Sequence, residues 1–269
     1  KNHLLKLFFI TIAFTSLIKL YDNSINLDAW QYGEWLINYQ NGFIRRGIVG
    51  EIIYLLSSII NNNINISFII IVFSFCSIYY YLSYIFIKKI EINIITLLII
   101  FSPLFYLFFV IISKVGIKKE IIFYIYYIYY LIYLEKKSFS LKRNWIFIFI
   151  FQLLLLNHEG VFFYLPYIII PLFFLIKKDE LNDLLLQAFS LILLSSLTII
   201  LLYLNKGTSQ HTIEICNSLG SYAPMKCDWW GPIYALSHDL QIGPLGKSNL
   251  FFYVHDDMTA YFGFIFYIL

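Results

Sequence analysis

Charged residues are scarce in this sequence: Asp, Glu, Lys and Arg make up 13% of its 269 residues, against about 25% in a soluble domain. Apolar residues make up 60%, and a soluble chain of this length cannot bury that much apolar surface. Intrinsic disorder is excluded for the same reason. The net charge of +3 is too small and too dispersed for a nucleic-acid binder. The composition therefore predicts a polytopic membrane protein.

Cysteine is scarce as well, and three cysteines are too few for a disulfide-based scaffold. Cys76 lies inside an apolar run, which is typical of a small packing residue. Cys216 and Cys227 lie together in one long polar segment that is predicted to face an oxidising compartment. We therefore expect a disulfide between them, and the alternative is a pair of free thiols.

Long apolar runs fill most of the chain, and a membrane helix needs about 20 apolar residues. We expect membrane helices at residues 4–20, 67–87, 93–112, 121–134, 145–156, 161–176 and 184–204, and a last one opening near Met258. Several are short, so residues 145–156 and 161–176 could instead form a hairpin that enters the membrane and returns. The chain starts without methionine and stops inside an apolar run, so we expect both ends to be incomplete.

Residues 48–60 are ambiguous because the apolar run is short and carries Glu51. We interpret them as a helix that lies in the membrane interface, which leaves the N-terminus in the cytoplasm. If they spanned the membrane instead, the N-terminus would lie outside. The first interpretation is preferred because it keeps Lys1 and Lys6 on the cytoplasmic side.

Basic residues in short loops set the orientation of a membrane protein. One side of the predicted bundle carries Lys88, Lys89, Lys136, Lys137, Lys142, Arg143, Lys177 and Lys178. The short loops on the other side carry Lys114, Lys118 and Lys119. The first side is therefore predicted to be cytoplasmic, and most acidic residues and histidines then fall on the outer side.

The predicted fold class is all-α. Residues 1–204 are expected to form a transmembrane helical domain with an interfacial segment at 28–60. Residues 205–257 are expected to form an extracytoplasmic loop, and residues 258–269 to begin a further membrane helix. The predicted location is the bacterial inner membrane, in a multi-pass arrangement whose candidate site faces outward.

The segment at residues 22–51 is the strongest candidate for a functional site. Its aromatic residues suit the lipid headgroup layer: Trp30, Tyr32, Trp35 and Tyr39. Asp28 and Glu34 lie among them, Gly42 permits a sharp turn, and Arg45 and Arg46 follow. Arginine binds phosphate through paired hydrogen bonds, and a carboxylate can take a proton from an attacking hydroxyl. A lipid phosphate would supply the phosphate at this depth, whereas the alternative is an interfacial helix with ordinary anchoring charges.

Two short outer turns carry further charged residues. Lys119 and Glu120 end one turn, and His158 and Glu159 form the other. An adjacent His and Glu can bind a metal ion or relay a proton, and ionisable groups at membrane depth are functional candidates. The spacing is not the HExxH of a zinc protease. For both turns the alternative is an ordinary polar loop.

The long loop at 205–257 is rich in glycine and proline, which predicts many turns. It also carries Trp229 and Trp230, whose apolar faces could stack on a sugar ring. The sequence contains no P-loop and no GxSxG motif, and no GxGxxG occurs in a nucleotide-binding context.

The order of these features resembles the GT-C superfamily of integral-membrane glycosyltransferases. The matching features are Asp28, Tyr32, Gly42, the helix at 48–60, the span at 67–87 that ends in two lysines, and the stretch from Pro103 to Glu120. The resemblance covers roughly residues 4–176 and concerns layout. Three features depart from the family: the usual proline pair is missing, the first-loop acid is single, and Glu120 stands where Asp is more frequent. The string FIRRGIVGE is also similar to uncharacterised membrane proteins of surface-polysaccharide gene clusters.

This resemblance implies a glycosyltransferase that moves a sugar from a polyprenyl-phosphate donor to an acceptor on the extracytoplasmic face. Asp28, with Glu34 beside it, would be catalytic, and Asp28 would serve as the general base. Arg45 and Arg46 would hold the donor phosphate. The remaining candidates for substrate binding are Lys119, Glu120, His158, Glu159, Trp229 and Trp230, and a divalent cation held by Glu120, His158 and Glu159 is left open.

The rival interpretation is a non-enzymatic membrane protein: a transporter, a flippase or a structural subunit of a larger complex. A transporter is expected to show internal repeats and charges in the middle of its spans. The sequence has no clear repeat and few such charges, whereas a structural subunit fits as well as before. The sugar, the acceptor and the oligomeric state are not encoded in any motif.

Overall fold

The computed structural model describes residues 2–26, 29–61, 63–90, 117–135, 141–175, 181–220 and 231–236. Every regular element in these ranges is a helix, which confirms the all-α prediction for this part of the chain. The helices expected at 93–112 and near Met258 lie outside these ranges, as does the terminal segment 258–269.

Three helices are long enough and apolar enough to cross a membrane: α1 (Asn2–Asn26), α4 (Ile64–Lys89) and α10 (Leu181–Leu204). Each one includes a predicted span and extends it by two or more residues at one end or both. On α1, large apolar side chains at spacings of three and four residues are exposed, namely Leu7, Ile10, Phe14 and Ile18. A stripe of this kind is what a helix that faces lipid presents.

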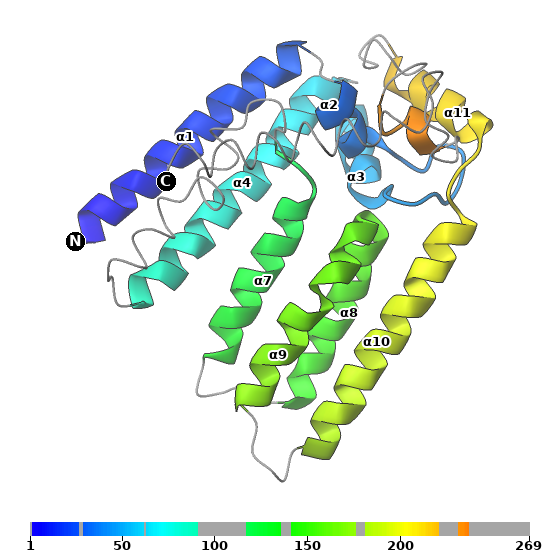
Figure 1. Cartoon of the computed structure of the whole chain (residues 1–269). Coiled ribbons are helices and arrows are strands. Elements are labelled where there is room, and N and C mark those ends of the chain that lie inside the picture. The colour runs from blue at the N-terminus through cyan, green and yellow to red at the C-terminus, as the bar shows by residue number, and fades with distance from the viewer. Residues whose placement is uncertain are drawn as a thin grey trace, which may run out of the picture.

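The remaining helices of the bundle are shorter. Helix α7 (Glu120–Leu134) has 15 residues and is therefore about 22 Å long. Helix α8 (Leu141–Asn157) is followed by the 3₁₀ helix η1 (Glu159–Tyr164) and by α9 (Leu165–Leu175). These elements occupy the predicted spans 145–156 and 161–176, which form an antiparallel hairpin (Figure 1). The single helix predicted at 161–176 is wrong in its first turn, where the backbone is 3₁₀.

The start of α9 has a local cause. Pro166 lies in the first turn of this helix, where its missing N–H leaves no hydrogen bond unmade. Proline is well tolerated at that place and poorly tolerated one turn later, so the regular α-helix begins at Leu165.

The bundle helices lie side by side, and the short helices gather at one end of them (Figure 1). These are α2 (Ala29–Leu36), α3 (Ile48–Ile59), α11 (Ser209–Leu219) and the 3₁₀ turn η4 (Tyr234–Leu236). The residues that precede α7, that join α8 to η1 and that follow α10 reach the same end. The topology therefore brings five separate stretches of sequence together there.

Helix α3 is confirmed as a helix and ends one residue before the predicted boundary. Its 12 residues extend about 18 Å, which is well short of the roughly 30 Å of a bilayer core. Gly50 on α3 lies against the carbonyl of Ile37, and a Cβ atom at this position would overlap with it. Glycine therefore lets α3 approach the chain that leaves α2.

Helix α11 was not predicted, because the sequence analysis treated residues 205–257 as a loop. Thr208 caps its first turn: the hydroxyl of Thr208 accepts from the backbone N–H of His211, and the His211 ring bonds back to the Thr208 backbone. Cys216 on this helix is disulfide-bonded, and its expected partner, Cys227, lies outside the described residues. Cys76 is free and buried, as expected for a packing residue.

Candidate functional site

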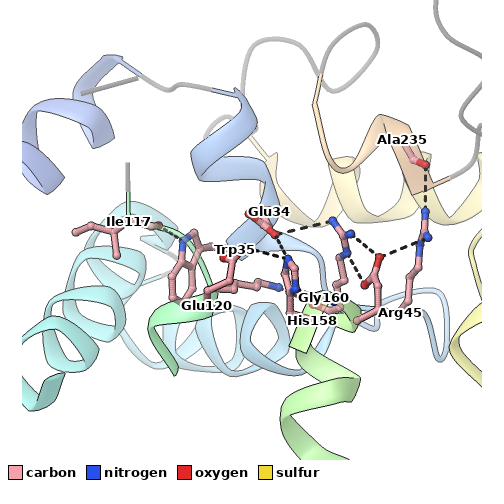
Figure 2. Close-up of polar contacts among 11 residues, drawn as sticks. Glu34, Trp35, Arg45, Ile117, Glu120, His158, Gly160 and Ala235 are labelled. Carbon is pink, nitrogen blue, oxygen red and sulfur yellow. Dashed lines mark hydrogen bonds and ion pairs between the residues drawn. The ribbon is translucent and has the colours of Figure 1, made fainter. Parts of the chain in front are cut away.

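A cluster of charged side chains lies at the end of the bundle where the short helices gather (Figure 2). Its members are Glu34, Arg45, Arg46, Lys119, Glu120, His158 and Glu159. All seven were candidates from sequence, although they come from three segments far apart along the chain. We call this group the ionic cluster.

The two arginines reach the cluster from the loop between α2 and α3. Gly42 turns this loop with a φ of 99°, and its N–H donates to the carbonyl of Tyr39 at 2.9 Å. The N–H of Arg45 donates to the carbonyl of Asn205 at 3.2 Å, at the end of α10. The N–H of Arg46 donates to the carbonyl of Leu156 at 3.2 Å, near the end of α8. The loop is thus tied to two bundle helices.

Arg46 is the centre of the ionic cluster. Its Nε donates to Oε2 of Glu159 at 2.7 Å, and its Nη2 donates to Oε1 of the same carboxylate. Its Nη1 lies 3.9 Å from Oε1 of Glu34. Burial alone would lower the pKa of the guanidinium, but the hydrogen bonds and charge of Glu159 and the charge of Glu34 raise it above its usual value. Arg46 is therefore permanently charged.

The backbone of Arg46 is unusual, with a φ of 67°, a left-handed conformation that a non-glycine residue rarely adopts. The Nζ of Lys119 donates to the carbonyl of Arg46 at 2.6 Å. The Lys119 residue is 1% exposed, and this burial lowers its pKa to about 7, against the raising effect of Glu34. Lys119 thus supports the backbone of Arg46 from below, whereas sequence analysis expected it to contact substrate.

His158 connects two carboxylates. Its Nε2 lies 3.3 Å from Oε1 of Glu34 and 3.6 Å from Oε1 of Glu120. The N–H of Gly160 donates to Nδ1 of His158 at 3.1 Å. Because Nδ1 accepts that bond, the neutral ring carries its proton on Nε2, facing the two carboxylates.

Glu34 and Glu120 differ in their surroundings. Burial raises the pKa of Glu34, but the hydrogen bond from His158 and the charges of Lys119 and Arg46 outweigh it and lower the pKa to about 2. Glu34 is therefore a stable anion and a weak base. Oε2 of Glu120 is buried and has no hydrogen-bond partner among the described residues, so this oxygen is available to a donor from a ligand.

Arg45 lies beside Arg46 and faces the same carboxylate. Its Nη1 is 3.7 Å from Oε1 of Glu159, and its Nη2 donates to the carbonyl of Ala235 at 3.5 Å (Figure 2). Burial raises the pKa of Glu159, but the Arg46 hydrogen bonds lower it to about 2, with Arg45 adding to the effect. Two guanidinium groups with one anionic partner between them form a site for an oxyanion.

The remaining sequence candidates, Asp28, Trp229 and Trp230, lie outside the described residues. Within the described part of the chain, no group of three or more His, Cys, Asp or Glu side chains is arranged to hold a metal ion. Sequence analysis missed two residues that serve the cluster through their backbones, Gly160 and Ala235. Backbone roles of this kind leave no side-chain signal, although the glycine that follows His158 and Glu159 was within reach.

Comparison of the chain with protein-family models, with curated proteins and with solved structures finds no match.

Proposed function

We propose that this chain is a polytopic membrane glycosyltransferase that moves a sugar from a polyprenyl-phosphate donor to an acceptor hydroxyl. The observation that carries the proposal is the pair Arg45–Arg46, which shares one carboxylate partner beside a His158 that bridges two further carboxylates. This combination offers both a phosphate site and proton-accepting groups at the end of an apolar helix bundle.

The side of the membrane follows from charge. Lys88 and Lys89 end α4, and Lys142 and Arg143 lie in the first turn of α8, at the end of the bundle opposite the ionic cluster. Short basic loops stay in the cytoplasm. The ionic cluster then faces the extracytoplasmic side of the bacterial inner membrane, where lipid-linked sugars serve surface polysaccharides.

Arg45 and Arg46 hold the donor phosphate in this proposal. Their side chains are 28% and 26% exposed, so a ligand can reach both guanidinium groups. As the bond between the anomeric carbon and the phosphate oxygen breaks, negative charge develops on the departing polyprenyl phosphate. Two fixed cations stabilise that charge more in the transition state than in the bound donor.

A carboxylate takes the proton of the acceptor hydroxyl as its oxygen bonds to the anomeric carbon. Asp28 keeps the role of base that the GT-C resemblance implies. Glu34 fits a positioning role better, because His158 and Arg46 already occupy it. Glu120 is the second candidate base, since one of its oxygens has no partner among the described residues. Trp229 and Trp230 would shape the acceptor pocket.

Binding of farnesyl phosphate to the purified protein in nanodiscs tests the proposal, with farnesol as the ligand that lacks only the phosphate. We expect the phosphate to bind at least tenfold more tightly than the alcohol. Arg45→Ala should remove that preference, because the phosphate loses charge-assisted hydrogen bonds. Arg143→Ala is the matched control, since Arg143 is exposed at the far end of α8.

Equal binding of farnesyl phosphate and farnesol by the wild-type protein would contradict the phosphate site. Analysis of surface glycans in cells that carry Arg45→Ala or Arg143→Ala then tests transfer itself. An unchanged glycan in the Arg45→Ala cells would favour the non-enzymatic alternative.

A further inference from the structure

Arg46 has two anionic partners that differ in exposure and geometry. Glu159 meets Nε and Nη2 with its two oxygens, in the fork arrangement of a bidentate pair. Glu34 lies 3.9 Å from Nη1. The side chain of Glu34 is 9% exposed, whereas that of Glu159 is 27% exposed. Glu159 is therefore the partner that can turn toward solvent without leaving the interior of the protein.

Glu159 also lies 3.7 Å from Nη1 of Arg45, so one carboxylate spans both guanidinium groups. Arginine binds carboxylate and phosphate oxygens with the same fork of N–H groups. A phosphate that enters this site must therefore take over N–H groups that Glu159 holds.

We propose that Glu159 is a built-in anion that occupies the Arg45–Arg46 site until a phosphate group displaces it. The inference rests on the proposed function and names the regulation of the same site. Glu159 keeps the two arginines in place while the site is empty of ligand, and its return favours release of the phosphate product.

The rest of the ionic cluster keeps its shape during this exchange. The backbone of Arg46 is fixed on both sides, by its N–H bond to Leu156 and by the Lys119 bond to its carbonyl. Glu34 remains near Nη1 and is held in turn by His158. The pKa of Glu159 is lowered to about 2, against the raising effect of burial, so the competitor stays ionised at every physiological pH.

The test compares binding of farnesyl phosphate by wild type, Glu159→Gln and Glu135→Gln in nanodiscs. Glu135 is the matched control, because it is an exposed glutamate whose carboxylate bonds Lys89 at the far end of the bundle. Neutralising Glu159 removes the competing anion, so we expect Glu159→Gln to bind about tenfold more tightly than wild type. Glu135→Gln should bind as wild type does. Inorganic phosphate in a second arm separates a requirement for a lipid phosphate from one for any phosphate.

Each outcome decides between the ideas. If wild type binds farnesyl phosphate and Glu159→Gln binds it equally or more weakly, the displacement is wrong and the proposed function stands. If neither protein binds any phosphate, both are wrong. If only Glu159→Gln binds, the displacement is supported in its strongest form. Should Glu159→Gln not fold, Glu159→Asp keeps the charge with a shorter reach, and about threefold tighter binding is expected of it. Equal or weaker binding by that variant would overturn the inference.

Discussion

Two polar regions of this protein solve the problem of burial in different ways. The ionic cluster uses full charges, and its arginines and Glu159 remain about a quarter exposed. The interface between α8 and α10 uses neutral groups. Asn144 donates to Gln187 at 2.9 Å, and both residues are buried. One level further along α8, Gln152 donates to Ser195 at 3.2 Å and accepts from Thr198 at 3.0 Å.

The difference follows from the cost of removing each group from water. A buried charge needs partners or a path to solvent, whereas a neutral amide needs only a hydrogen bond. Between membrane helices, neutral polar pairs contribute modestly and fix the register of one helix against the other. Charges collect instead at the end of the bundle, where solvent and lipid headgroups are within reach. The chemistry of this protein is therefore expected at that end.

The largest effect should come from the proposed base. Asp28→Asn keeps the size and the hydrogen bonding of the side chain but cannot accept a proton, so transfer should fall by about 10²–10⁴-fold. Glycan analysis of cells that carry the variant measures it, with Glu120→Gln in parallel. An unchanged glycan in Asp28→Asn together with a loss in Glu120→Gln would move the role of base to Glu120.

Removal of one charge from the ionic cluster should be the next largest effect. Arg46→Ala leaves Glu34 and Glu159 without their main cation and should lower the free energy of unfolding by about 3–5 kcal/mol. Unfolding by denaturant in detergent micelles measures this. A loss below about 1 kcal/mol would mean that the cluster behaves like exposed surface charges, and the comparison with the α8–α10 interface would fail.

The pH dependence of stability should reflect the ionic cluster alone. The pKa values of Glu34 and Glu159 lie near 2 in the folded protein, below the usual 4.5, so their contribution is complete above about pH 4.5 and is lost as the pH falls toward 2. The pKa of Lys119 is lowered from 10.5 to about 7. The unfolded chain then binds more protons than the folded one between these values, and stability should rise with pH across that window.

Unfolding free energies of wild type and Lys119→Met from pH 6 to pH 10 check the second window. The variant should lose the rise above pH 7, while Glu34→Gln should keep it and lose part of the acid-side dependence. The same slope in wild type and Lys119→Met would assign the rise to another group.

The smallest effect should come from the neutral interface. Gln187→Leu removes the acceptor of Asn144 and should cost about 1 kcal/mol, as is usual for a polar contact between membrane helices. The same unfolding measurement applies, and binding of farnesyl phosphate should not change. A cost that equals that of Arg46→Ala, or an effect on binding, would show that the two regions are not separate in role.

Much of the fold was predictable because apolar runs report membrane helices directly. The runs at 4–20, 67–87 and 184–204 reappear in α1, α4 and α10. Helix α11 was missed because its sequence is polar and short, and the only signal was the Thr208–His211 cap. The 3₁₀ turn η1 was missed because a hydropathy pattern does not distinguish a 3₁₀ helix from an α-helix.

The sequence by itself determined the residue types of the candidate site and the helical, apolar nature of the chain, because both are local properties. Only the tertiary structure decided which charges meet. Arg46 and Glu159 are 113 positions apart, and their pairing depends on α8 ending beside the loop that follows α2. The same approach gave Lys119 a supporting position under Arg46 and left an oxygen of Glu120 without a partner among the described residues. Burial and distance made these assignments, and both arise only when separate helices pack together.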